Sequence, residues 1–270
     1  MNPTPNRPDA DTRLRFLRRA QSRRPPRLRR GVALLPSLFT MGNMFCGYAC
    51  IVYSMRGELV TAAPFIGFAV VLDMFDGRIA RMTNTTSAFG VELDSLADVI
   101  SFGLAPALLT FAWGLSELGK VGWAAGFVYV SAAAMRLARF NIQSAAQLDK
   151  RFWVGMPSPA AAGVLASTVY AWPYPLSGYQ QGIGALAVVL IPAVLMVSTV
   201  RFRSFKTINF GWTPSWRGPF MFVLVIVFIA IQPRITLAIL AYAYLISPLV
   251  EAAINRARAS RPEVPPAGSL

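Results

Sequence analysis

The hydrophobic positions of this chain lie in long apolar runs that short polar segments separate. Eight runs are candidate transmembrane helices, near 33–55, 60–80, 95–115, 121–141, 158–174, 182–200, 219–232 and 234–254. About 20 mainly apolar residues span the ~30 Å hydrocarbon core of a bilayer. The pattern therefore predicts an all-α fold, a polytopic bundle of about eight transmembrane helices. An even number of spans leaves both termini on one side.

Composition supports a membrane protein. Of the 270 residues, 55% are hydrophobic and 14% are charged, which is too apolar for a soluble core with a polar surface. A membrane domain is expected over 32–256. The flanking segments 1–31, rich in Arg and Pro, and 257–270, rich in Pro, are expected to be disordered. No internal repeat and no second soluble domain is evident.

The basic residues predict the orientation in the membrane. With a cytoplasmic amino terminus, 23 of the 26 Lys and Arg residues fall in cytoplasmic segments, as the positive-inside rule requires. Both termini, and the loop between the second and third spans, should then be cytoplasmic. The net charge of +14 is interpreted as attraction to anionic lipid head groups, and no nucleic-acid partner is expected.

Four aspartates break the apolar pattern at the ends of the second and third spans: Asp73, Asp76, Asp94 and Asp98. A charged side chain near the bilayer centre costs roughly 2.5–3.5 kcal/mol on insertion scales, so a cluster of them indicates a function. At about 100° per residue, Asp73 and Asp76 share one helix face. Asp94 and Asp98, four residues apart, share another. Two antiparallel helices would present these two pairs to a common space.

Like charges this close repel, and hard divalent cations prefer carboxylate oxygens. Mg²⁺ or Mn²⁺ is therefore expected, and four carboxylates suffice for two ions. The chain has no histidine, which excludes His-based general bases and Ser-His-Asp triads. An acidic intramembrane cluster is also compatible with a divalent-cation transporter. Cys46 and Cys50 are interpreted as small hydrophobic residues on one helix face.

The residues between the aspartates favour a ligand that carries phosphate. Gly77 and Ala80 share the Asp73 face and leave room for a bulky group near the backbone. Arg81 can neutralise a phosphate, and the hydroxyl of Ser87 in the following loop can bind one.

Residues 73–98 read D-x2-D-G-x2-A-R-x8-G-x3-D-x3-D, which resembles the signature of the CDP-alcohol phosphotransferase family at every defined position. The resemblance implies a six-helix core, here with two further helices, in which an alcohol displaces CMP from a CDP-linked substrate. It implies that Asp73, Asp76, Asp94 and Asp98 bind two metal ions and that Asp98 is also the general base. It further implies that Gly77, Arg81 and Ser87 contact the nucleotide diphosphate.

Other segments are similar to the phosphatidylserine synthases of this family: 35–43, 135–141, 155–161 and 203–206. Relatives commonly carry Asn where this chain has Ser37, so any contact made by that Asn side chain is in doubt here. Asn43 is the substitute candidate for binding CDP-diacylglycerol. Serine brings a carboxylate and the lipid a diphosphate, so four basic residues are candidate contacts for either: Arg136, Arg139, Arg203 and Lys206.

The expected function is metal-dependent transfer of a phosphatidyl group from CDP-diacylglycerol to L-serine, in phospholipid biosynthesis. Within the family, glycerol 3-phosphate or inositol phosphate is the alternative acceptor; a phosphorylated acceptor would need a denser basic pocket. The resemblance also implies a homodimer. The protein is expected in a bacterial-type cytoplasmic membrane, with the active site on the cytoplasmic side.

Overall fold

The structure is a computed structural model that describes residues 28–82, 87–145, 152–203 and 217–259. Most of the two flanking segments expected to be disordered, and Lys206, lie outside these residues. Within them, α2 begins at Leu28 and α10 ends at Ala259. Each of these helices therefore includes three or four residues that the sequence assigned to a flanking segment.

All eight predicted segments form helices. The first four correspond to α2 (Leu28–Met55), α3 (Leu59–Met82), the continuous run α4 (Ala88–Asp98), η1 (Val99–Leu104) and α5 (Ala105–Trp113), and α6 (Lys120–Ala145). The last four are α7 (Ser158–Ala171), α8 (Tyr179–Val197), α9 (Arg217–Ile231) and α10 (Pro233–Ala259), and a short 3-10 turn, η2 (Leu115–Leu118), precedes α6. The predicted all-α membrane bundle is confirmed.

Five of the described helices are long and apolar enough to cross a membrane: Ser37–Met55, Leu59–Ile79, Phe89–Trp113, Lys120–Gln143 and Tyr179–Val197. At 1.5 Å per residue, the 14 residues of α7 and the 15 of α9 are shorter than the ~30 Å hydrocarbon core. The apolar helices, together with large exposed hydrophobic side chains along them, make this an integral membrane protein.

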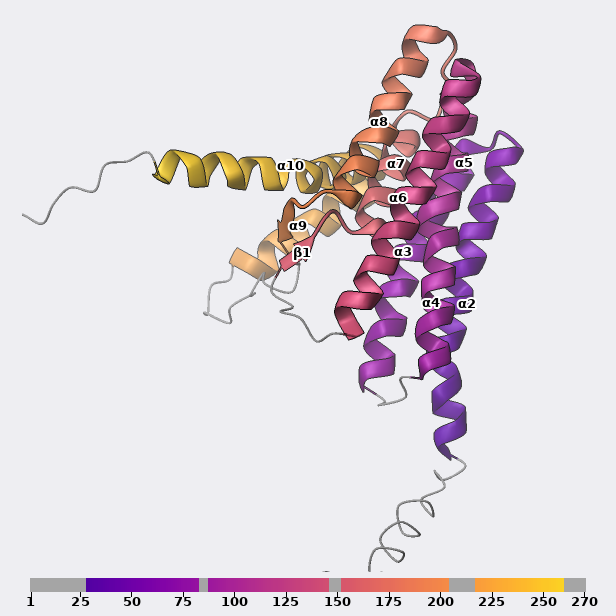
Figure 1. Ribbon diagram of the computed structural model, residues 1–270, viewed down its shortest axis with the longest axis vertical. Helices are drawn as coiled ribbons and strands as arrows, with labels where there is room; N and C mark the ends of the chain where they lie inside the picture. Colours follow the sequence, from indigo (N-terminus) through magenta and orange to yellow (C-terminus); the bar gives the residue numbers. More distant parts are fainter. Residues whose placement is uncertain (1–27, 83–86, 146–151, 204–216, 260–270) are drawn as a thin grey trace, which may run out of the picture.

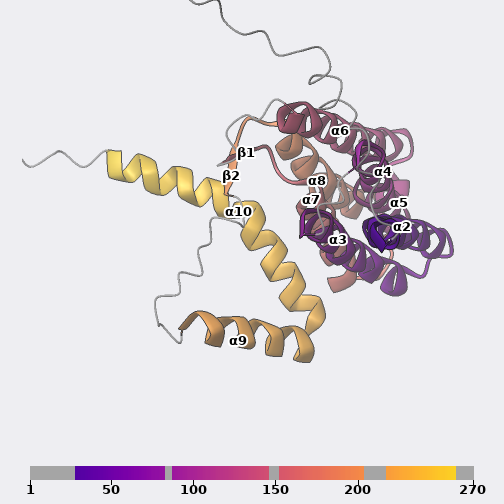
Figure 2. The ribbon, with the colours of Figure 1, turned by 90° about the horizontal axis from the view of Figure 1, so that it is seen from below.

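Helices α2 to α8 stand side by side as an upright bundle, whereas α10 runs crosswise to it and α9 is inclined to it (Figure 1). Viewed from below, α9 lies away from the bundle and α10, which contains Pro248, bends (Figure 2). The first part of α10 packs against α7, where the hydroxyls of Tyr242 and Thr168 are 2.9 Å apart. Arg234 lies over the ring of Tyr170, 5.5 Å from its centroid.

The third predicted span is not a uniform α-helix. Directly after Asp98 it becomes a π-helix, η1, in which the Ala105 amide donates to the carbonyl of Ile100. The hydroxyl of the fully buried Tyr129 on α6 donates to the carbonyl of Phe102, at 3.2 Å. Inserted π-turns of this kind occur often at functional sites, and this one lies beside the predicted aspartate cluster.

A two-stranded antiparallel ribbon, β1 (Phe152–Val154) with β2 (Arg201–Arg203), joins the segments after α6 and α8. The sequence did not predict it. Gly155, just after β1, has a φ of 85°, and a Cβ there would lie 2.4 Å from the Met196 carbonyl oxygen. A residue with a side chain would therefore be strained and would clash. Met156 follows fully buried, and α7 then starts at Ser158.

Candidate metal centre

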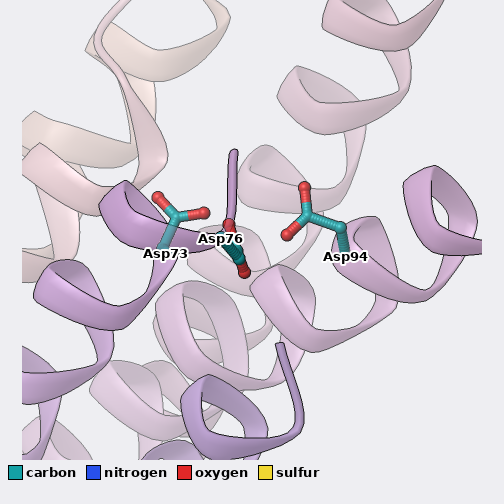
Figure 3. Close-up of side chains that lie close together, drawn as sticks. All are labelled: Asp73, Asp76 and Asp94. Atoms are coloured by element: carbon teal, nitrogen blue, oxygen red, sulfur yellow. The ribbon is translucent and has the colours of Figure 1, made fainter. Parts of the chain in front are cut away.

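Three of the four aspartates converge on one point. Asp73 and Asp76 come from the end of α3 and Asp94 from α4, and each offers a carboxylate oxygen within 4.8 Å of the others. Figure 3 shows the three side chains directed toward one another from the two helices. The two helices run in opposite directions (Figure 1). The predicted convergence of carboxylates from two antiparallel helices is thus what the structure shows.

Asp98 lies one turn beyond Asp94 on α4 and is not part of the three-residue group. Its side chain is 8% exposed and interacts electrostatically with Asp73, Asp94 and Asp76. Its Oδ1 accepts a hydrogen bond from Nδ2 of Asn43 on α2, at 3.1 Å. The fourth aspartate therefore lines the same space, with one oxygen already engaged.

The donor set fits a hard divalent cation. Carboxylate oxygens are the ligands that Mg²⁺ and Mn²⁺ prefer, and carboxylates this close repel one another unless a proton or a cation lies between them. In addition, Oδ1 of Asp94 is buried and has no hydrogen-bond partner among the described residues. A buried oxygen without a donor is costly, and a bound cation would satisfy it.

Helix α2 contributes two polar side chains to this space. Oγ1 of Thr40 donates to Oδ2 of Asp76 at 3.2 Å, and Asn43 donates to Asp98. Thr40 is 4% exposed and Asn43 is fully buried. Thr40 was not singled out in the sequence, and Asn43 was expected to bind CDP-diacylglycerol. The available signal was a polar pair three residues apart within an apolar span.

Ser87, expected as a phosphate ligand, is the N-cap of α4. Its Oγ accepts a hydrogen bond from the amide of Gly90 at 3.0 Å, and the side chain is exposed. Such a cap satisfies one of the free amides of the first helical turn. Ser87 therefore fixes where α4 begins, and it lies five residues before Glu92 and seven before Asp94.

The predicted basic contacts have different surroundings. Arg136 on α6 is 8% exposed, and its Nη1 donates to Oγ of Ser158 at 3.5 Å. Its guanidinium lies 5.6 Å from the ring centroid of Phe140 and interacts electrostatically with Asp98 and Asp73. Arg139 is exposed. The side chains of Arg81 and Arg203 lie outside the described part of the structure.

The remaining residues singled out in the sequence lie near the cluster or in the core. Gly77 follows Asp76 on α3 and is half-buried. Ser37 is also half-buried, one turn before Thr40. Cys46 and Cys50 are buried free thiols in the hydrophobic core, as the sequence indicated.

Comparison with known proteins identifies similar chains. The sequence profile described as CDP-alcohol phosphatidyltransferase matches residues 33–199. The CDP-diacylglycerol–serine O-phosphatidyltransferase of Helicobacter pylori is 37% identical over 221 residues, covering 79% of this chain and 88% of the relative. The protein of the same name from Bacillus subtilis is 34% identical over 64% of this chain and 91% of its own length. The archaetidylserine synthase of Methanothermobacter thermautotrophicus is 34% identical, covering 62% of this chain and 69% of its own.

Proposed function

The chain belongs to the CDP-alcohol phosphatidyltransferase family, and we propose that it transfers the phosphatidyl group of CDP-diacylglycerol to the hydroxyl of L-serine. The products are phosphatidylserine and CMP. The observation that carries this proposal is the convergence of Asp73, Asp76 and Asp94 within the signature spacing of that family. The choice of serine rests on relatives whose names specify it.

We assign the ion-binding role to Asp73, Asp76, Asp94 and Asp98, which would hold two divalent cations, Mg²⁺ or Mn²⁺. When bound, the ions would neutralise the diphosphate and stabilise the charge that develops during its displacement. Oδ1 of Asp94, which is buried and has no hydrogen-bond partner in the described part of the chain, supports this assignment.

The chain's own groups carry the proton transfer. The carboxylate of Asp98 takes the proton from the serine hydroxyl as its oxygen forms a bond to the phosphorus that bears the lipid. The bond from that phosphorus to the bridging oxygen of the diphosphate breaks, and CMP leaves. General-base catalysis of this kind contributes about 10²–10⁴-fold to rate.

Binding of the two substrates is assigned to the groups around the cluster. Gly77 gives the diphosphate close access to the α3 backbone. Arg81, near the end of α3, and Ser87, just before α4, are assigned further contacts with the diphosphate. Arg136, buried and close to the carboxylates, is a contact for the serine carboxylate or the lipid phosphate. Arg139, Arg203 and Lys206 are the further candidates for these two anions.

The distribution of basic residues supports a cytoplasmic active site, with both termini on that side, in a bacterial-type cytoplasmic membrane. We also expect a homodimer.

An acceptor panel tests the proposal. Purified protein in detergent, with CDP-diacylglycerol and Mg²⁺ or Mn²⁺, is given radiolabelled L-serine, glycerol 3-phosphate or inositol phosphate, and labelled lipid is measured. Label from serine alone is expected. Incorporation of either phosphorylated alcohol in preference to serine would contradict the choice of acceptor. Divalent-metal flux into liposomes with no release of CMP would instead indicate a transporter.

A further inference from the structure

Helix α2 carries no acidic residue of the cluster, yet its side chains donate one hydrogen bond to a carboxylate of α3 and one to a carboxylate of α4. Thr40 binds Asp76 of α3 and Asn43 binds Asp98 of α4, at 3.2 and 3.1 Å. Residues three apart in a helix lie on the same face. One face of α2 therefore reaches a carboxylate from both metal-binding helices.

The packing of α2 makes this connection rigid. It packs along α3 and also against α4 and η1, whereas α3 and α4 share few close contacts with each other. On the same face of α2, one turn after Asn43, a Cβ at Gly47 would lie 2.6 Å from the Ser101 Oγ of η1. Ser101 Oγ in turn donates to the Asn43 carbonyl, at 2.9 Å. The backbone of Asn43 is thus fixed to the π-helix that follows Asp98.

The side-chain amide of Asn43 uses its NH₂ group, but not its oxygen, in hydrogen bonding to the described residues. Its Nδ2 faces the carboxylate, because the opposite orientation would bring two acceptor oxygens together. Its Oδ1 is buried and has no hydrogen-bond partner among the described residues. A core selected for stability alone would avoid such an orphaned oxygen. The arrangement indicates that Asn43 is placed to orient the carboxylate of Asp98.

We propose that Thr40 and Asn43 are positioning residues, each of which holds one carboxylate oxygen so that the other is directed at the reaction. Thr40 fixes Asp76 as an ion ligand, and Asn43 fixes Asp98 as the base. The assignment rests on the proposed function, and it gives Asn43 a role different from the binding of CDP-diacylglycerol expected from the sequence. Groups that orient metal-binding carboxylates typically affect metal affinity or activity 10- to 100-fold.

Two near-isosteric substitutions separate the two roles, Asn43→Leu and Thr40→Val. The matched control is Thr110→Val, since Thr110 is also fully buried but donates to the Pro106 carbonyl of its own helix. Each full-length variant is assayed for kcat and KM, for CDP binding by calorimetry, and for Mn²⁺ binding by electron paramagnetic resonance.

Asn43→Leu is expected to lower kcat about tenfold or more and to leave CDP affinity within twofold of wild type. Thr40→Val is expected to weaken Mn²⁺ binding about tenfold, and Thr110→Val to change neither. Asn43→Asp, which keeps the size but replaces the donor by an acceptor, should lose at least as much kcat as Asn43→Leu.

A normal kcat in Asn43→Asp, or weaker CDP binding with unchanged kcat in Asn43→Leu, would overturn the role of Asn43. Mn²⁺ affinity in Thr40→Val equal to that of Thr110→Val would overturn the role of Thr40. Failure of the proposed function looks different: wild type would release no CMP with serine, or Asp98→Asn would keep full turnover.

Discussion

Individual carboxylates on α4 differ in their surroundings, and these differences separate reactive groups from surface groups. Asp98 is 8% exposed and accepts a hydrogen bond from Asn43. Glu92, less than two turns earlier on the same helix, is exposed to solvent. Among the described residues, a hydrogen-bond donor is found for Asp98 but not for Glu92. Charge alone therefore does not distinguish the proposed base from a surface carboxylate, whereas burial together with a fixed donor does.

Asp98→Asn is expected to lower turnover by about 10²–10⁴-fold, the usual contribution of a general base, because an amide cannot take the serine proton. Membrane insertion and CDP binding should persist. The measurement is labelled serine incorporation by purified protein, with Glu92→Gln as the matched control on the same helix. Retained incorporation in Asp98→Asn would exclude it as the base.

Asp94→Asn is expected to weaken divalent-cation binding by at least about tenfold, because the buried Oδ1, which has no partner among the residues described, is the oxygen best placed for an ion. Mn²⁺ binding, followed by electron paramagnetic resonance, and the metal titration of activity should shift together. Unchanged Mn²⁺ affinity would mean that another group satisfies this oxygen.

Among the elements, α2 was predicted as a span that offers Asn43 to CDP-diacylglycerol, but its hydrogen bonds to the aspartates were not predicted. The aspartates of α3 and α4 could be found from the sequence because their helical phase and spacing are local properties. Thr40 could not, because the face of α2 that meets Asp76 depends on how the helices pack. The same holds for the π-helix after Asp98, whose residues are apolar like the rest of that span. The β1–β2 ribbon likewise depends on pairing between distant segments.

Gly47→Ala tests the close packing of α2 against η1. The added Cβ would meet Ser101 Oγ at 2.6 Å and the Ser101 Cα at 2.8 Å, so the helices must separate and Asn43 must move from Asp98. We expect reduced kcat and a destabilisation of about 1–3 kcal/mol, typical of overpacking.

Gly67→Ala on α3 is the matched control, since a Cβ there has no neighbour within 4 Å. Thermal unfolding in detergent and serine incorporation are measured for both variants. Equal behaviour of Gly47→Ala and Gly67→Ala would show that contact between α2 and η1 is not tight.

The whole molecule presents its carboxylate cluster near the loop between α3 and α4, at one end of the bundle (Figure 1). Basic residues flank this end, whereas the turn between α2 and α3 has only Arg56. This distribution of basic residues supports the proposal that the aspartates lie on the cytoplasmic side.

Cysteine labelling tests this orientation. Met82→Cys, at the exposed end of α3, should react with an impermeant maleimide only in inside-out vesicles, and Glu58→Cys, exposed at the opposite end, only in right-side-out cells. The native Cys46 and Cys50 are buried and should give little background. The reverse pattern would place the site on the outer side.

The most direct measurement is the stoichiometry of CMP and labelled lipid formed by the purified wild-type protein from CDP-diacylglycerol and radiolabelled L-serine. One CMP per phosphatidylserine is expected, with both products lost in EDTA and restored by Mg²⁺ or Mn²⁺. CMP formed without serine, or lipid formed at an unchanged rate in EDTA, would contradict metal-dependent phosphatidyl transfer at the aspartate cluster.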